Sequence, residues 1–207
     1  MQVRTKFGAL AVLVGIWMLP QQRTFSQSIV DKKPAFEGAL ALIDAPRPVP
    51  KHLSDLFDRM ESANRRSQDV FRKLSVEQMN FQPANGTHTP RWNAEHMAGR
   101  QLLFFSQIYH ALDPDIPVIN RNPRQMPKDY QPRNPNWSGK EEARWMQRVD
   151  NFCRRHAHLL ENLPANKKPP ASPWPSLEAL LQQMERHYDE HTAHVEKKFL
   201  LPNWPNN

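Results

Sequence analysis

A segment near the C-terminus, residues 176–199, has the apolar period of one long amphipathic helix. At 3.6 residues per turn, seven of its apolar side chains fall on a single stripe. They are Leu177, Leu180, Leu181, Met184, Tyr188, Val195 and Phe199. Because such a stripe has to pack against other elements, this helix must belong to a larger helical core.

Three histidines accompany that stripe. His191 lies within it, His187 lies at its edge one turn earlier, and His194 lies toward the polar side. Two histidines four residues apart on a helix can direct both rings to one metal ion, as they do in many zinc sites. An inward histidine can also be a hydrogen-bonded core residue, and the residues alone leave both interpretations open.

His187 to His191 also fit the H-x-x-E-H pattern of inverted zinc peptidases, with Glu190 as general base. Only sixteen residues follow His191. Those peptidases have a much larger α/β domain with a further acidic ligand downstream. We therefore keep a zinc peptidase only as an unfavoured alternative.

The first 28 residues predict export. Arg4 and Lys6 precede an apolar run at 7–19, and small residues follow, which is the pattern of a secretory signal peptide. This run is shorter than the roughly twenty residues that span a bilayer. We therefore expect a cleaved signal, no stable membrane insertion afterwards and a periplasmic or extracellular protein, with a retained anchor as the alternative.

Charge and cysteine content exclude two further classes. The formal net charge is +7, but Arg4, Lys6 and Arg23 of the signal segment supply three of these charges. The remaining basic residues occur as scattered pairs, so nucleic acid is not an expected partner. The single cysteine, Cys153, excludes an internal disulfide.

Helical periodicity recurs in four segments, and none alternates as a strand would. A proline-rich arm at 29–50 precedes the first of them, a long proline-rich loop at 113–137 separates the second from the third, and 201–207 form a tail. The expected helices cover residues 51–74, 93–112, 138–163 and 176–199. This order predicts an all-α four-helix bundle over residues 51–200 with a long crossover loop.

Two of these helices carry further candidates for a site. Asn93 is a plausible N-cap of the second helix, which is apolar on most sides, so His96 and Arg100 on one of its faces are candidate site residues. His96 could equally be a hydrogen-bonded core residue. In the third helix, which opens with a capping box at 138–141, Cys153 and His156 face inward. We favour a structural role for that pair over a ligand set or a thiol nucleophile.

The chain resembles the DinB-like superfamily, which includes bacillithiol transferases and YfiT-type metal-dependent hydrolases. The resemblance rests on Pro-Arg-Trp-Asn-Ala-Glu-His at 90–96 and His-Tyr-Asp-Glu-His-Thr-Ala-His-Val at 187–195. It implies a divalent metal ion, zinc or nickel, held by one histidine of the second helix and two of the last.

His187 and His191 match the family pattern directly. The second-helix histidine of the family lies eight residues after the tryptophan, and Arg100 occupies that position here. An arginine offers a cation no lone pair, so we predict that His96, one turn earlier, takes the role.

The resemblance further implies a metal-dependent hydrolase or thiol transferase that acts on a small molecule, either a thiol or an electrophile. Arg100, Glu190 and Tyr188 are the candidates for catalytic roles. A non-catalytic binding module with a structural or lost metal site is the alternative. The sequence leaves open whether the chain is an enzyme and whether it forms a homodimer.

Overall fold

The computed structural model describes residues 48–123 and 129–206. The predicted signal peptide, and all of the N-terminal arm before residue 48, lie outside the described residues. None of the described helices has both the length and the apolar character needed to cross a membrane.

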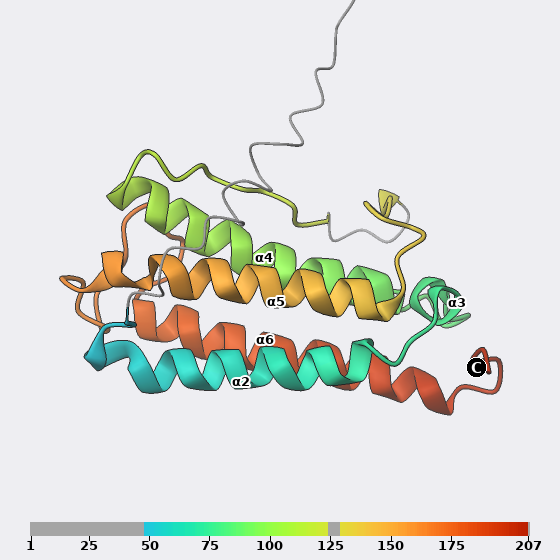
Figure 1. Ribbon diagram of the computed structural model, residues 1–207. Helices are drawn as coiled ribbons and strands as arrows, with labels where there is room; N and C mark the ends of the chain where they lie inside the picture. The colour runs from blue at the N-terminus through green and yellow to red at the C-terminus, as the bar shows by residue number, and fades with distance from the viewer. Residues whose placement is uncertain (1–47, 124–128, 207) are drawn as a thin grey trace, which may run out of the picture.

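Four long helices form a bundle (Figure 1). They are α2 (Ser54–Phe71), α4 (Pro90–Leu112), α5 (Gly139–His156) and α6 (Leu177–Glu196). α2 packs against α5 and α6, and α4 packs against the same two helices from the other side. α2 and α6 run in one direction, whereas α4 and α5 run in the opposite direction (Figure 1). The predicted all-α four-helix bundle is confirmed.

The connection between α4 and α5 is the predicted crossover loop. Because these two helices run in the same direction, the chain between them has to return along the length of the bundle (Figure 1). Its first part packs on α4. Ile116 and Ile119 are buried in the core, and the Ile119 amide donates to Ser106 Oγ at 2.9 Å.

Short helices extend this frame. They are η1 (Lys51–Leu53), α3 (Val76–Asn80), η3 (Ala157–Leu160) and η4 (Lys197–Leu200). The sequence indicated only a break where α3 lies. A capping box begins α3: Ser75 Oγ accepts a hydrogen bond from the Gln78 amide, and Gln78 Oε1 accepts one from the Ser75 amide.

The start of α4 corrects one expectation. Thr89, not Asn93, is the N-cap, since Thr89 Oγ1 accepts a hydrogen bond from the Trp92 amide at 3.0 Å. Pro90 takes the first helical position, where its missing amide hydrogen costs nothing. Asn93 therefore lies inside the helix, and its side chain is available to the interior.

The end of α6 corrects another. Six of the seven residues of the predicted stripe are buried, but Phe199 is 38% exposed. The α-helix ends at Glu196 and continues as η4, a 3-10 helix with about three residues per turn, which rotates the last side chains off the stripe.

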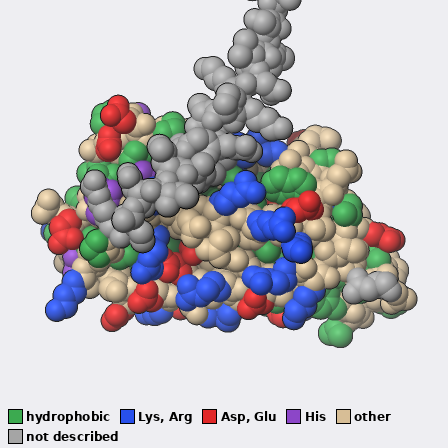
Figure 2. Space-filling model, in the orientation of Figure 1, with side chains coloured by type: hydrophobic (Ala, Val, Ile, Leu, Met, Phe, Trp, Pro, Cys, Tyr) green, Lys and Arg blue, Asp and Glu red, His purple; other side chains and the backbone are tan. Residues whose placement is uncertain are grey.

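The third helix begins as predicted, but α5 ends at His156 and continues only as η3 to Leu160, short of the predicted residue 163, and His156 is half-buried. The Ser138 amide donates to the Glu141 side chain at 2.6 Å, which completes the expected capping box. Cys153 is fully buried, and burial raises the pKa of its thiol, so it is not an activated nucleophile. On the face shown in Figure 2, Lys and Arg side chains are interspersed with Asp and Glu.

Candidate metal centre

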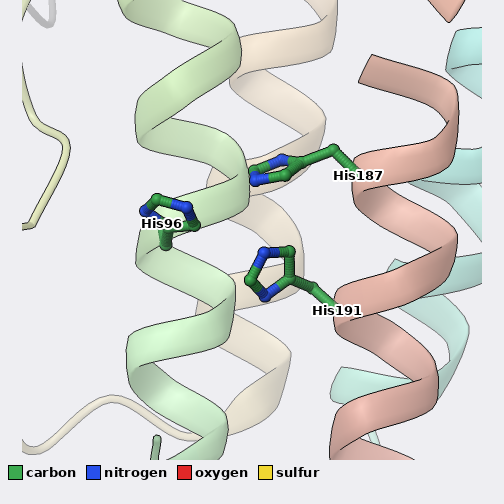
Figure 3. A group of neighbouring side chains, drawn as sticks. All are labelled: His96, His187 and His191. Atoms are coloured by element: carbon green, nitrogen blue, oxygen red, sulfur yellow. The ribbon is translucent and has the colours of Figure 1, made fainter. Parts of the chain in front are cut away.

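The three predicted ligands come together between α4 and α6 (Figure 3). His96 projects from α4, and His187 and His191 project from successive turns of α6. One nitrogen of each ring lies within 4.8 Å of the other two. Among the described residues, this is the one group of three or more histidine, cysteine or acidic side chains close enough to hold an ion.

The spacing of the rings suits a single small cation. The ring centroids lie 5.0 Å apart for His96 and His187, 5.1 Å for His96 and His191, and 4.5 Å for His187 and His191. A tetrahedral zinc ion with Zn–N bonds of about 2.0–2.1 Å needs its ligand nitrogens roughly 3.4 Å apart. The three ring nitrogens, which lie within 4.8 Å of one another, approach this separation.

Burial holds the three imidazoles in the neutral form that binds metals. His96 and His187 are only 4% and 8% exposed, and His191 is half-buried. Burial, reinforced by nearby histidines and Arg100, lowers the pKa of each ring from 6.5 to about 3. Near neutral pH the rings therefore carry free lone pairs.

Two ring nitrogens are left without partners. Nδ1 of His96 and Nδ1 of His187 are buried and accept or donate no hydrogen bond. A buried polar atom without a partner is unfavourable, and such atoms are rare outside functional sites. The donor set and these orphaned nitrogens both fit a divalent cation.

His191 is oriented by Asn93. The Asn93 amide nitrogen donates to the Thr89 carbonyl at 2.8 Å, which turns its oxygen toward the imidazole. That oxygen lies 2.7 Å from His191 Nδ1, so Nδ1 carries the hydrogen and donates it. The tautomer places the free lone pair on Nε2. In histidine metal sites, the ring nitrogen that does not bind the metal usually donates a hydrogen bond to an oxygen acceptor of this kind.

A pocket of about 770 Å³ opens beside the histidines. Its walls are the turn before α4, the first turns of α4 and the end of α6 with η4. The described residues that line it are Asn85, Gly86, Thr87, His88, Trp92, Asn93, His96, His191, His194, Lys197, Lys198 and Leu201. His96 and His191 reach the pocket, whereas His187 is the inner member of the cluster.

Trp92 lines the pocket beside the histidine cluster. His88 stacks on one side of the indole with ring centroids 3.5 Å apart, and His96 stacks with it at 4.3 Å. This packing fixes the plane of the His96 ring. No sequence pattern pointed to His88, which lies in the turn before the helix.

Of the three predicted catalytic candidates, only Arg100 lies near the cluster. It is half-buried one turn beyond His96, with its guanidinium carbon 5.6 Å from the Phe104 ring centroid. Arg100 Nε is buried and has no hydrogen-bond partner. Arg100 is not among the residues that line the pocket.

The other two candidates point elsewhere. Tyr188 is fully buried, and its hydroxyl donates to Gln101 Oε1 at 2.6 Å, so it is a core residue. Glu190 is exposed, does not line the pocket, and forms no ion pair with Arg100. Glu190 therefore does not lie where the zinc-peptidase alternative needs its general base, against the pocket. His194 is exposed as predicted, with its ring 5.9 Å from His191 at the pocket wall.

A four-helix bundle with histidines converging from facing helices is compatible with a metal site in its core. A family model described as the DinB superfamily matches residues 59–195, which is more than half of the chain. The chain therefore belongs to the DinB superfamily. Searches of curated proteins and of solved structures found no match to this chain.

Proposed function

We propose that the protein binds one divalent metal ion, zinc or nickel, through His96, His187 and His191. The observation that carries the proposal is the convergence of three neutral imidazoles, two buried and one half-buried, beside an open pocket. Catalytic zinc sites commonly have three protein ligands and leave a further position for water or substrate.

We further propose that the site serves hydrolysis or thiol transfer on a small molecule. When bound, a divalent ion supplies Lewis acidity toward a water molecule or a thiol. The chain's own residues position that chemistry: Asn93 orients His191, Trp92 holds the plane of His96, and burial keeps the three rings neutral. The pocket has room for a small organic substrate.

Metal stoichiometry tests the first part. Elemental analysis of metal-loaded, desalted protein should give about one divalent ion per chain. His96→Ala, His187→Ala and His191→Ala should each abolish retention of the ion. The matched control is His194→Ala, which removes a histidine of the same helix and should retain it. Absence of a bound ion, or equal loss in His194→Ala and His187→Ala, would refute the assignment.

An exchangeable coordination position separates the enzyme from a non-catalytic binding module. Cobalt-substituted protein should change its visible spectrum when dithiothreitol is added, because a thiolate would enter the open position. A closed, structural site should give an unchanged spectrum.

The signal-like segment at 1–28 supports the further proposal of export, and N-terminal sequencing of the protein from the exported fraction tests it.

A further inference from the structure

Basic side chains line the pocket beside the histidines. His88, His194, Lys197 and Lys198 line it, and none of the described lining residues is acidic. Neither lysine forms an ion pair with a described carboxylate. The pocket therefore presents positive charge without compensation from the protein.

Lys198 is the unusual member of this set. It lies in η4 directly after α6 and is only 5% exposed, although lysine is rarely buried without a partner. Its Nζ donates to the His194 carbonyl at 3.0 Å, which uses one of three N–H donors. A buried ammonium with a single carbonyl partner is unfavourable, and an anion in the pocket would relieve that cost.

The charge of the Lys198 ammonium also affects His88, on the opposite wall of the pocket. After burial, the charge of Lys198 is the largest influence that lowers the pKa of His88. His88 lies in the turn before α4, whereas Lys198 lies beyond the end of α6, so the charge reaches across the space between them. Burial likewise lowers the pKa of Lys198, as expected for an uncompensated cation.

The position of Lys198 sets the length of a ligand. Its Nζ lies 3.0 Å from the carbonyl of His194, which follows His191 by three residues, or about 4.5 Å along a helix axis at 1.5 Å per residue. A molecule with an anionic group at Lys198 and a reactive group at the histidines would span this distance. Leu201 and the edge of Trp92 supply apolar surface for its middle.

We propose that Lys198 is the anion-binding residue of this pocket, which takes a small organic carboxylate whose other end reaches the histidine site. A carboxylate fits better than a phosphate, because its single negative charge matches the single charge of the buried Lys198 ammonium, whereas a phosphate monoester carries about −1.5 to −2 at pH 7. The assignment rests on the proposed function for the role of the histidines, and on the pocket itself for the binding of the anion.

The test uses metal-free protein, so that a carboxylate cannot bind through the metal. Binding of 3-phenylpropanoate is compared with binding of 3-phenylpropanamide, which has the same shape and no charge. Titration followed by amide NMR should show saturable shifts around residues 85–88 and 197–201. The acid should bind at least about tenfold more tightly than the amide, the difference expected for a hydrogen bond to a charged group.

Three variants make the test specific to Lys198. Lys198→Met should lose the preference for the acid, with affinity at least about tenfold lower, and Lys198→Arg should keep most of it. Lys197→Met removes the exposed neighbour of the same pocket and should change affinity by less than about threefold. If Lys198→Met lowers the melting temperature markedly, Lys198→Gln takes its place.

Several outcomes would overturn the assignment. They are equal binding of acid and amide, no saturable binding of either, or equal losses in Lys197→Met and Lys198→Met. Failure here is distinguishable from failure of the proposed function, because metal stoichiometry is measured separately. A protein that holds the ion and ignores the acid refutes only the carboxylate site, and one that binds the acid without holding an ion refutes only the metal site.

Discussion

Arg91 and Glu142 form an ion pair that is completely buried between α4 and α5, with 2.9 Å between Nη1 and Oε1. Arg91 also donates to Asn80 Oδ1 at 2.7 Å and to the Trp137 carbonyl at 2.5 Å. One side chain thus joins α3, the end of the crossover loop and α5 to the first turn of α4. Trp92 and the pocket follow directly along the helix.

Arg91→Met should destabilise the bundle strongly. It removes the cation that compensates Glu142 and leaves a buried carboxylate, a change that typically costs about 3–5 kcal/mol. Glu142→Gln should cost less, because a neutral amide can still accept from Arg91, whose guanidinium keeps its acceptors on Asn80 and Trp137. Urea unfolding of both variants measures the difference, and an equal loss would contradict the role assigned to the ion pair.

Asn93→Ala should weaken metal binding without removing a ligand. The His191 ring would lose the acceptor that fixes its tautomer, and loss of such a partner typically lowers affinity by about 10- to 100-fold. Asn93→Asp is the control, since it keeps an oxygen acceptor at the same position. Competition with a chromogenic chelator gives both affinities. Unchanged affinity in Asn93→Ala would show that His191 needs no orienting partner.

The bundle and the histidine pair were predictable because both depend on local periodicity. A period of 3.6 residues fixes which side chains share a face, so Leu180, Tyr188 and His191 could be placed inward from the sequence alone. The family resemblance then indicated His96. Its convergence with the pair depends on how α4 packs against α6, which no local pattern specifies.

The remaining site residues depend on where helices begin and end. Thr89 and Asn93 are both competent N-caps, and the wrong choice hid the role of Asn93. At the other end, an uninterrupted α-helix would point Phe199 inward, but η4 is wound more tightly and leaves Phe199 38% exposed. Lys198 follows Leu180 by 18 residues, which is five full turns of an α-helix, so the period places it near the apolar face, whereas its burial without an acidic partner depends on how the end of α6 packs.

Gly99→Ala should push the crossover loop away from α4. A Cβ at this position would lie 2.7 Å from the Asn122 Cα and 2.9 Å from the Arg121 carbonyl oxygen. Both are backbone atoms, so no side-chain rotation relieves the clash. We expect Gly99→Ala to lower the free energy of unfolding by about 1–3 kcal/mol, as substitutions at other overpacked sites do.

Faster hydrogen exchange at residues 116–122 would accompany that loss. Gly86→Ala is the control, because nothing lies within 4 Å of its added Cβ and only the positive φ of 75° is strained. Gly86→Ala should therefore leave exchange in the crossover loop unchanged. Wild-type exchange at 116–122 in Gly99→Ala would show that the loop does not pack on α4.

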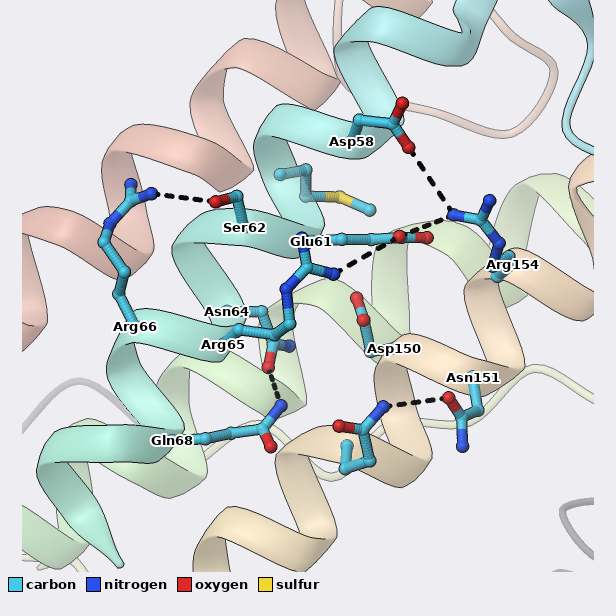
Figure 4. Close-up of polar contacts among 12 residues, drawn as sticks. Asp58, Glu61, Ser62, Asn64, Arg65, Arg66, Gln68, Asp150, Asn151 and Arg154 are labelled. Atoms are coloured by element: carbon cyan, nitrogen blue, oxygen red, sulfur yellow. Dashed lines mark hydrogen bonds and ion pairs between the residues drawn. The ribbon is translucent and has the colours of Figure 1, made fainter.

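Asp150 projects from α5 among polar side chains of α2 and α5 (Figure 4). Its Oδ1 accepts from Gln101 Nε2 at 3.4 Å, and Gln101 Oε1 accepts from the hydroxyl of Tyr188. Burial first, and then the charge of Glu61, raises the pKa of Asp150 to about 7. At mildly acidic pH the carboxyl is therefore protonated in the folded chain and ionised in the unfolded chain.

This difference gives a signed pH dependence. Between about pH 4 and 7 the folded state binds one more proton than the unfolded state, so the contribution of Asp150 to stability falls as pH rises, by up to about 1.4 kcal/mol per pH unit. It is fully present below the unfolded pKa and is lost once pH exceeds the folded value of about 7.

Asp150→Asn cannot titrate, so subtracting its stability from that of the wild type isolates this residue from the other titrating groups. Urea unfolding at pH 5, 6, 7 and 8 should show a difference that declines and then levels off. Asp58→Asn, at an exposed carboxylate of the same region, should show no such trend. A wild-type advantage over Asp150→Asn that stayed constant from pH 5 to 8 would mean that Asp150 is ionised in the folded bundle.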